Sequence, residues 1–203
     1  MMKRKVIIAT KNKGKAKEFE RMLSPKGYDV LTLLDFPDFQ DIDETGETFE
    51  ENAVLKAEEA SAVLNEIVIA DDSGLIIDAL DGRPGVYSAR YAGEAKDDND
   101  NMDKVLTELK GVPYNERTAR FYCVLAIAGP DRETRTYSGA CEGKILDERR
   151  GTNGFGYDPI FFVEEKDRAM AELTSEEKSS ISHRGKALKQ FEDDLEELSG
   201  DSL

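Results

Sequence analysis

Two parts of the sequence combine residue types that could bind a phosphorylated ligand. The first lies between an expected strand and an expected helix, where lysine side chains, free backbone N–H groups and the positive end of a helix come together. It consists of Thr10, Lys11, Asn12, Lys13, Gly14 and Lys15. Phosphate binding is the natural use of such a loop, although it lacks the glycine and lysine spacing of a Walker A motif. An ordinary polar loop is the alternative.

The second part contains acids that could hold a divalent cation. Asp71, Asp72, Ser73 and Gly74 close a short apolar stretch. Acids at the end of a buried strand are unfavourable unless they are paired, solvated or bound to metal. Adjacent strand residues face opposite sides, so Asp71 and Asp72 should have different roles. Oxygen ligands without His or Cys suit magnesium or manganese, and a simple turn cap at Asp72 or Ser73 is the alternative.

Two further motifs contain candidate nucleoside or anion contacts. Residues 151–159 (GTNGFGYDP) are dense in glycine and aromatic residues, and Phe155 and Tyr157 could offer a stacking surface to a base. Core aromatics in a glycine-rich turn are the alternative. The only histidine, His183, lies near Lys178 and Arg184 at the start of the last expected helix. It could contact an anion or a carbonyl oxygen, or it could be structural.

These residues must be positioned by a mixture of strands and helices. Strands are expected at residues 4–9, 28–33, 67–71, 119–127, 134–145 and 160–163, and helices at residues 15–23, 48–64, 102–109 and 182–198. Residues 75–80 could pair with the strand at 67–71 or continue it. Thr48 and Glu51 have the spacing of a capping box. Residues 119–127 are almost wholly apolar, which predicts a central strand. The fold class expected is α/β, with helices packed around one long mixed sheet.

The charge distribution narrows the possible partners. The chain has 203 residues, with 43 acidic and 28 basic side chains and a net charge of −15. Residues 1–26 carry +7, so the remainder carries −22. This acidity disfavours a nucleic-acid polymer as partner, and no apolar stretch approaches the length of a membrane span. We expect one domain over residues 1–203 and a cytoplasmic protein with its two cysteines reduced.

Together the motifs resemble the ITP/XTP pyrophosphatase family. The motifs are Thr10-x-Asn12-x-x-Lys15, Glu44-Thr-Gly-Glu-Thr-Phe-x-Glu-Asn52, Ala70-Asp-Asp-Ser-Gly-Leu75, Pro84-Gly-Val-Tyr-Ser-Ala-Arg90-Tyr, Gly154-Phe-Gly-Tyr-Asp-Pro159 and Ser182-His-Arg184. They occur in this order over nearly the whole chain. The resemblance implies an elongated mixed α/β fold with two lobes flanking a central substrate cleft, a homodimer, and dependence on Mg²⁺, for which Mn²⁺ may substitute. It also implies hydrolysis of ITP, dITP or XTP to the monophosphate and pyrophosphate.

The resemblance also assigns roles to individual residues. It implies that residues 10–15 bind the triphosphate, that Asp72 is the general base and a metal ligand, and that Glu44 is the second metal ligand, with Asp43 next to it. The remaining implied substrate contacts are Ser73, Phe155, Gly156, Tyr157, Asp158, Lys178, His183 and Arg184. A pyrophosphatase for modified pyrimidines, dTTP or UTP is the closest alternative function. A non-catalytic nucleotide sensor is an alternative of another class.

Overall fold

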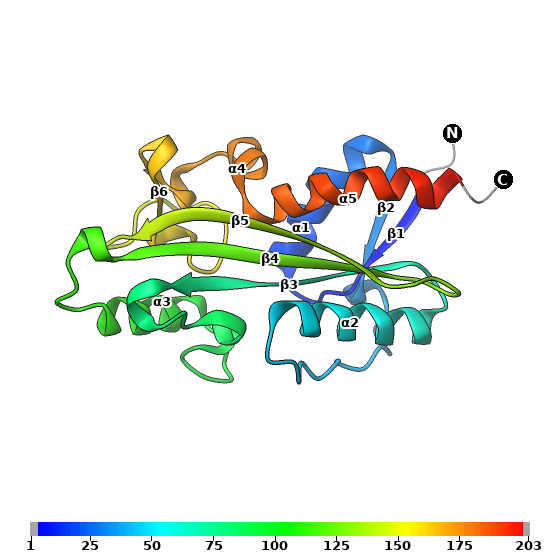
Figure 1. Ribbon diagram of the computed structural model, residues 1–203, viewed down its shortest axis with the longest axis horizontal. Coiled ribbons are helices and arrows are strands. Elements are labelled where there is room, and N and C mark those ends of the chain that lie inside the picture. Colours follow the sequence, from blue (N-terminus) through cyan, green and yellow to red (C-terminus); the bar gives the residue numbers. More distant parts are fainter. Residues whose placement is uncertain (1–3, 201–203) are drawn as a thin grey trace. The chain divides into compact units, whose positions relative to one another are not determined.

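The structure is a computed structural model that describes residues 4–200 and the side chains of residues 5–192. Over that range it has a seven-stranded sheet in the order β2-β1-β3-β4-β5-β6-β7 (Figure 1). The strands are β1 (Arg4–Ile8), β2 (Tyr28–Thr32), β3 (Val68–Ile77), β4 (Thr118–Ala128), β5 (Arg135–Ile145), β6 (Phe161–Val163) and β7 (Arg168–Ala169). The helices are α1 (Lys13–Leu23), α2 (Phe49–Leu64), α3 (Asp98–Glu108), α4 (Ser175–Ile181) and α5 (His183–Gly200).

The sheet is mixed, as the sequence predicts. Strand β1 pairs in parallel with β2 and with β3, whereas β6 is antiparallel to both β5 and β7. Strand β4 is fourth in the order, which confirms the central position expected from its apolar residues. The expected strand at 67–71 and the segment after it form one continuous strand, β3, so Ser73 and Gly74 do not interrupt it.

The chain divides into two compact units. Unit 1 comprises Met1–Asp72, Cys123–Ser138 and Arg184–Leu203, and unit 2 comprises Ser73–Tyr122 and Gly139–His183. Strands β3, β4 and β5 each contribute residues to both units. The chain passes from one unit to the other within two candidate motifs, between Asp72 and Ser73 and between His183 and Arg184.

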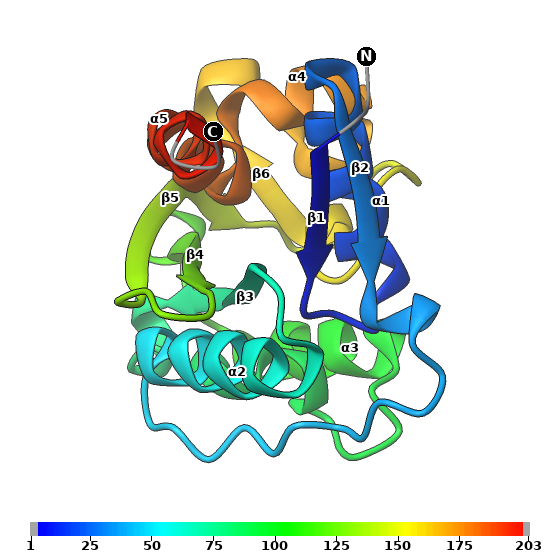
Figure 2. The same ribbon diagram turned by 90° about the vertical axis from the view of Figure 1, so that its right-hand side faces the viewer.

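Unit 1 is organised around the parallel strands. Helix α2 covers one face of its part of the sheet, and α5 covers the opposite face (Figures 1 and 2). Helix α1 shares a core with α5, because Phe19 and Leu23 pack in one cluster with Leu188 and Phe191. Burial of such a Leu or Phe side chain contributes roughly 1.5–3 kcal/mol, so this cluster fixes both helices on the strands that lead to the candidate site.

Unit 2 has its own apolar core. Leu75, Phe121 and Phe161 come from β3, β4 and β6, and they pack with Val105 from α3 and Ile181 from α4. This core anchors the segment that carries Phe155, Gly156, Tyr157 and Asp158, because Tyr157 is one of its members. Among the residues that the structure describes, no helix has the length and apolar character needed to cross a membrane.

Candidate functional site

The parallel pairing of β1 and β3 places two candidate motifs at one edge of the sheet. Ile7 is paired with Val68 and Ile8 with Ile69. Because β1 ends at Ile8 whereas β3 continues to Ile77, the loop after β1 lies beside the residues of β3 that follow Ile69. Ligands of α/β proteins commonly bind beyond the carboxyl ends of parallel strands, and the end of β1 is such a place. The pairing therefore brings residues 10–15 to Asp71.

The loop after β1 is ordered by its own side chains. The side-chain oxygen of Asn12 caps α1 and accepts hydrogen bonds from the N–H groups of Gly14 at 2.8 Å and Lys15 at 3.0 Å. Thr10 accepts a bond from the N–H of Asn12 at 3.1 Å. The sequence suggests free N–H groups at this helix start, but the chain itself satisfies these three. Lysine side chains are therefore the groups of this loop that remain suited to phosphate.

The three lysines of the loop have different surroundings. Lys11 donates to the carbonyl of Phe39 at 2.9 Å and pairs with Asp41 at 2.7 Å. Lys13 is exposed on the first turn of α1. The ammonium group of Lys15 lies 2.5 Å from Oδ1 of Asp71, and its side chain is 16% exposed. Only Lys15 of the three thus enters the buried cluster at the sheet edge.

Asp71 is a fully buried carboxylate with several donors. Nε of Arg184 donates to Oδ2 at 2.8 Å, and the thiol of Cys123 donates to the same oxygen at 3.0 Å. Burial alone would raise the pKa of the Asp71 carboxyl, but the charges of Arg184 and Lys15 hold it well below its usual range. Burial and the Asp71 charge raise the pKa of Cys123 well above its usual value. Asp71 is therefore ionised, and Cys123 is a neutral thiol donor.

Arg184 is buried between two acids. It is 1% exposed, and it bonds to Glu18 of α1 as well as to Asp71. The resemblance assigns Arg184 to phosphate or base, whereas the contacts described in unit 1 direct its guanidinium group to these two carboxylates. The burial of an arginine is tolerable when such partners compensate its lost hydration.

Asp72 and Glu44 are joined by a lysine that the sequence analysis did not identify. The ammonium group of Lys56, on α2, lies 2.7 Å from Oε1 of Glu44 and 3.2 Å from Oδ1 of Asp72. It also donates to the backbone carbonyl of Asp71 at 2.9 Å. Glu44 is therefore the acid of its loop that reaches Asp72, whereas the neighbouring Asp43 is exposed.

Burial and charge affect this group in opposite ways. Burial would lower the pKa of Lys56, but Asp72 and Glu44 raise it above its ordinary value, so the ammonium group stays charged. Burial raises the pKa of Asp72, and the Lys56 charge offsets only part of that rise. A carboxylate with a raised pKa is a stronger proton acceptor than an ordinary aspartate.

The donor set at Asp72 fits a hard divalent cation. Oδ2 of Asp72 is buried and has no hydrogen-bond partner, which is unfavourable unless a water, an ion or a ligand completes the site. Glu44 supplies a second carboxylate nearby. No group of three or more His, Cys, Asp or Glu residues suited to a metal occurs within the described part of the chain. Two carboxylates suit magnesium, which usually takes its other ligands from water and phosphate.

In unit 2 a second lysine–carboxylate pair lies beside an aromatic ring. The ammonium group of Lys178 is 2.5 Å from Oδ2 of Asp158, and both side chains are buried. The same oxygen accepts the N–H of Phe155 at 3.0 Å, and Lys178 lies 4.9 Å from the centre of the Phe155 ring. Gly154 has a φ of +79°, and a side chain there would collide with the Asp158 carboxylate. The glycine-rich turn thus holds Asp158 in place.

The two aromatic residues of this segment differ in burial. Tyr157 is 5% exposed, and its hydroxyl donates to the carbonyl of Ser88 at 2.7 Å. It is therefore a core aromatic, the alternative that the sequence left open. Phe155 is half-buried. The N–H of Gly156 donates to Asp98 at 2.8 Å, so the first turn of α3 also supports this segment.

The remaining candidates of unit 2 are His183 and Ser73. The His183 ring is 6% exposed and stacks on Phe121 at a centroid distance of 5.0 Å. Ser73 is half-buried in β3 and directly follows Asp72. Stacking on a core ring fixes the orientation of the imidazole.

The sequence did not lead us to Lys56 or Asp98. Only Lys56 stands in a sequence pattern that could have identified it. Lys56 occurs among the small and apolar positions of its helix, next to Ala57 and three residues after Ala53, which are both fully buried. A lysine on the buried face of a helix requires a partner. Asp98 lies in the acidic run 97–103, which reads as solvated surface, so nothing in the sequence distinguishes it.

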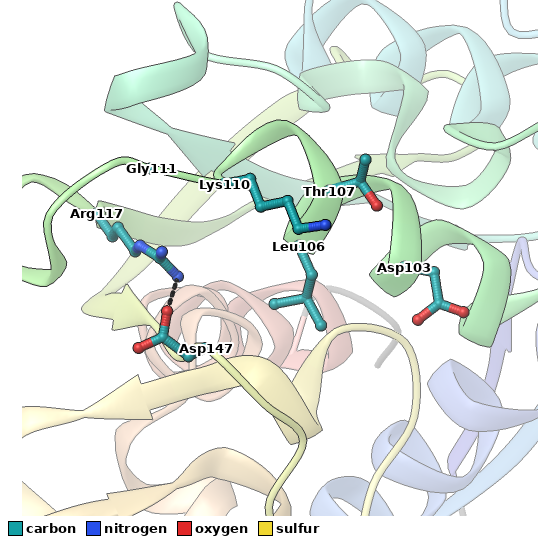
Figure 3. A pocket seen from close by; sticks show the side chains of 7 residues that line it. All are labelled: Asp103, Leu106, Thr107, Lys110, Gly111, Arg117 and Asp147. Carbon is teal, nitrogen blue, oxygen red and sulfur yellow. Dashed lines mark ion pairs between the residues drawn. The ribbon is translucent and has the colours of Figure 1, made fainter.

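A hollow of about 390 Å³ lies elsewhere in unit 2, and none of the candidate residues lines it (Figure 3). Its lining residues are Asp103, Leu106, Thr107, Lys110, Gly111, Arg117 and Asp147. Arg117 points toward Asp147, with an ion pair of 2.7 Å, and donates to the carbonyls of Val112 and Leu109. These bonds give Arg117 a structural role at the end of α3.

The fold and the lysine–carboxylate clusters define a mixed α/β protein with candidate anion and cation sites. Comparisons with known proteins identify its family. The model of the Ham1 family matches residues 6–194. The dITP/XTP pyrophosphatases of Bacillus cereus and Bacillus subtilis are each 58% identical to this chain, over 196 and 193 residues. Those alignments cover 96% and 95% of this chain and 96% and 98% of the relatives.

Solved structures agree with the sequence comparisons. The Ham1 protein of Staphylococcus aureus has a TM-score of 0.83 at 47% identity, with 95% of this chain and 98% of that chain covered. A HAM1 protein from Coxiella burnetii has a TM-score of 0.85 at 41% identity, with 96% and 99% covered. The chain belongs to the Ham1 family.

Proposed function

We propose that the protein hydrolyses the non-standard purine nucleoside triphosphates ITP, dITP and XTP to the nucleoside monophosphate and pyrophosphate. Relatives that are 58% identical over nearly the whole chain and named dITP/XTP pyrophosphatase support this substrate class. The observation that carries the proposal is the buried Oδ2 of Asp72, which lacks a partner beside two acids and a charged lysine. A carboxylate oxygen without a protein partner is available to accept a proton from a bound water or to coordinate an ion.

The proposed chemical step uses residues of unit 1. Lys15 in unit 1 neutralises charge on the triphosphate, and Asp72 accepts the proton of the attacking water. The water oxygen bonds to the α-phosphorus, the bond from that phosphorus to the bridging oxygen breaks, and pyrophosphate leaves. Phosphoryl transfer depends mainly on such positioning and electrostatics. Lys11, Lys13 and the ordered loop assist at the phosphates.

Asp72 and Glu44 would hold Mg²⁺, and Mn²⁺ could take its place. A divalent cation supplies charge neutralisation on the phosphate oxygens. The positive charge of Lys56 lies between the two carboxylates and reduces their mutual repulsion. Its position also leaves Oδ2 of Asp72 available while Oδ1 is bonded.

Unit 2 would contact the nucleoside and select the base. The proposed contacts are Ser73, Phe155, Gly156, Asp158, Lys178 and His183. Tyr157 and Arg184 are buried and bonded within the protein, so we assign them to supporting the site and not to touching the base. Phe155 is the half-buried aromatic residue of this segment, so we assign it to stacking. Donors in this set would bond the 6-keto oxygen of inosine or xanthine and would lose a bond against the 6-amino group of adenine. A lost bond of this kind can lower the rate by about 10⁴-fold.

The test is pyrophosphate release from ITP with Mg²⁺ and with EDTA, using the wild type, Asp72→Asn and Asp29→Asn. Asp29 is an exposed acid on β2 of the same unit, so Asp29→Asn matches the loss of charge away from the site. We expect magnesium-dependent release that Asp72→Asn removes and Asp29→Asn keeps. Near-normal release by Asp72→Asn would refute the assignment of Asp72 as base.

A substrate panel separates the proposal from its alternatives. We expect kcat/KM for dITP and XTP to exceed that for dGTP and dATP, and equal values would refute base selection. Higher values for dTTP, UTP or modified pyrimidines would indicate the related pyrimidine enzyme instead. Binding of ITP without release of pyrophosphate would indicate a sensor.

Four further proposals concern the whole chain. We propose that residues 1–203 act as one pyrophosphatase domain, because the candidate residues are shared between both units. The protein is further proposed to be a cytoplasmic homodimer that does not bind nucleic-acid polymers. Light scattering would give the mass of two chains, and a DNA titration at low salt would show no saturable binding. A monomeric mass or tight DNA binding would overturn these assignments.

A further inference from the structure

Asp71 stands at the centre of the buried charges of unit 1, although the proposed reaction gives it no contact with substrate or metal. Its carboxylate is wholly buried, and Oδ1 is 2.5 Å from the ammonium group of Lys15. Oδ2 accepts from Arg184 at 2.8 Å and from Cys123 at 3.0 Å. A carboxylate with donors on both oxygens cannot rotate without breaking one of these bonds.

The cluster continues beyond Asp71 to a second acid. Arg184 is 1% exposed and forms an ion pair with Glu18, whose side chain is 14% exposed. Glu18 lies on α1 three residues after Lys15, so it is one helical turn away along the same helix. The chain of contacts thus runs from Glu18 through Arg184 and Asp71 back to Lys15. Both ends belong to the helix that follows the phosphate loop.

We propose that Asp71 is a positioning residue that holds the ammonium group of Lys15 where it meets the substrate phosphates, and that Glu18 and Arg184 fix Asp71 for this purpose. The inference rests on the proposed function for the identity of the phosphate ligand. Lys56 bonds to the backbone carbonyl of Asp71, and a change of the Asp71 side chain keeps that acceptor. The Asp71 carboxylate also bonds to Arg184 and Cys123, so a double-mutant cycle is needed to isolate its effect on Lys15.

The charge of Asp71 predicts an unusual combination of kinetic changes. A negative carboxylate near the phosphate site opposes the binding of a polyanion, so we assign the benefit of Asp71 to its placement of Lys15. Asp71→Asn keeps the shape and removes the charge. We expect kcat for ITP to fall about tenfold or more, which corresponds to an ordinary interaction between contacting residues, while KM stays equal or decreases. Partial unfolding would lower the apparent kcat at unchanged KM, so kcat is calculated per folded molecule from the unfolding curve of each variant.

The decisive measurement is a double-mutant cycle of Asp71→Asn and Lys15→Ala on the full-length protein with ITP and Mg²⁺. If Asp71 acts through Lys15, Asp71→Asn changes kcat little once Lys15 is absent. Asp78→Asn is the matched control, because Asp78 is an exposed acid paired with Arg120 in unit 2. We expect that control to keep the wild-type kcat. Thermal unfolding of each variant monitors the fold.

Removal of a buried counter-charge could prevent folding, so Glu18→Gln provides a second variant. It leaves Asp71 and Lys15 intact and removes only the outer support of Arg184. We expect a smaller fall in kcat with no rise in KM, and no further fall in the Lys15→Ala background. A wild-type kcat for Asp71→Asn, or a loss of the same size with and without Lys15, would overturn the proposal.

A binding experiment separates failure of this inference from failure of the proposed function. If the wild type releases no pyrophosphate from ITP, the proposed function fails. The same double-mutant cycle is then carried out with a binding readout, the affinity for inorganic tripolyphosphate in EDTA, measured by calorimetry. Lys15→Ala should weaken that affinity several-fold in the wild type and much less in Asp71→Asn. An equal effect of Lys15→Ala in both backgrounds would refute the positioning role on its own.

Discussion

Replacement of Lys56 by methionine should destabilise the protein far more than replacement of an ordinary surface lysine. The ammonium group lies 2.7 Å from Glu44 and 3.2 Å from Asp72. At an effective dielectric constant of about 20, these distances correspond to attractions of about 6 and about 5 kcal/mol. Desolvation of a buried ammonium group offsets several kcal/mol of that sum. Because Lys56→Met leaves the buried Asp72 and the partly buried Glu44 without their shared cation, we expect a net loss of about 3–5 kcal/mol.

The assay is urea-induced unfolding at pH 7 in EDTA, with Lys5→Met as the matched control. Lys5 pairs with Glu66 at 2.9 Å in the same unit, but both side chains are nearly half exposed. An exposed pair of this kind contributes about 0–1 kcal/mol. The similar distances therefore isolate the effect of burial. If Lys56→Met and Lys5→Met lost the same free energy of unfolding, the argument from burial would be wrong.

Three further outcomes are expected from local geometry. Gly154→Ala should lower kcat/KM for ITP at least about tenfold, because the added methyl group displaces the Asp158 carboxylate; unchanged kinetics would contradict this. Thr48→Ala should lower the free energy of unfolding by about 1 kcal/mol in urea titrations, because it removes the capping box of α2. Cys123 and Cys141 are buried, so a thiol reagent should modify both rapidly in urea and neither in the native protein; fast native labelling would refute this.

The elements of the fold were predictable where local signals agreed. Helix α2 begins at the Thr48 capping box that the sequence predicts, and β4 is central because residues 119–127 are apolar on both faces. The sequence left open whether residues 75–80 continue the strand through Gly74 or pair with it, and the structure shows that the strand continues to Ile77. An isolated glycine in a strand pattern usually indicates a bulge or an end. Pairing with strands that are distant in sequence determines how far β3 extends, and the residues around Gly74 contain no information about that pairing.

The candidate site was predictable in its residue types but not in its pairings. The sequence indicates a lysine loop and an acid pair, and it correctly separates Asp71 from Asp72, whose carboxylates bond to different cations. The contact of Asp71 with Arg184 spans 113 residues of sequence. With 28 basic and 43 acidic residues in the chain, no spacing rule selects that partner. Charge pairing at this range depends on the completed fold.

These pairings change the meaning of the net charge of −15. The buried cluster of unit 1 has more acids than cations: it consists of Lys15, Lys56, Arg184, Glu18, Glu44, Asp71 and Asp72. Three cations and four carboxylates give it a net negative charge, although it contains the lysine proposed to bind phosphate. Under the proposed function, Lys15 therefore offers the triphosphate a charge that Asp71 already balances in part. Additional positive charge must accompany the substrate, and that requirement gives a divalent cation an electrostatic role independent of its ligand geometry.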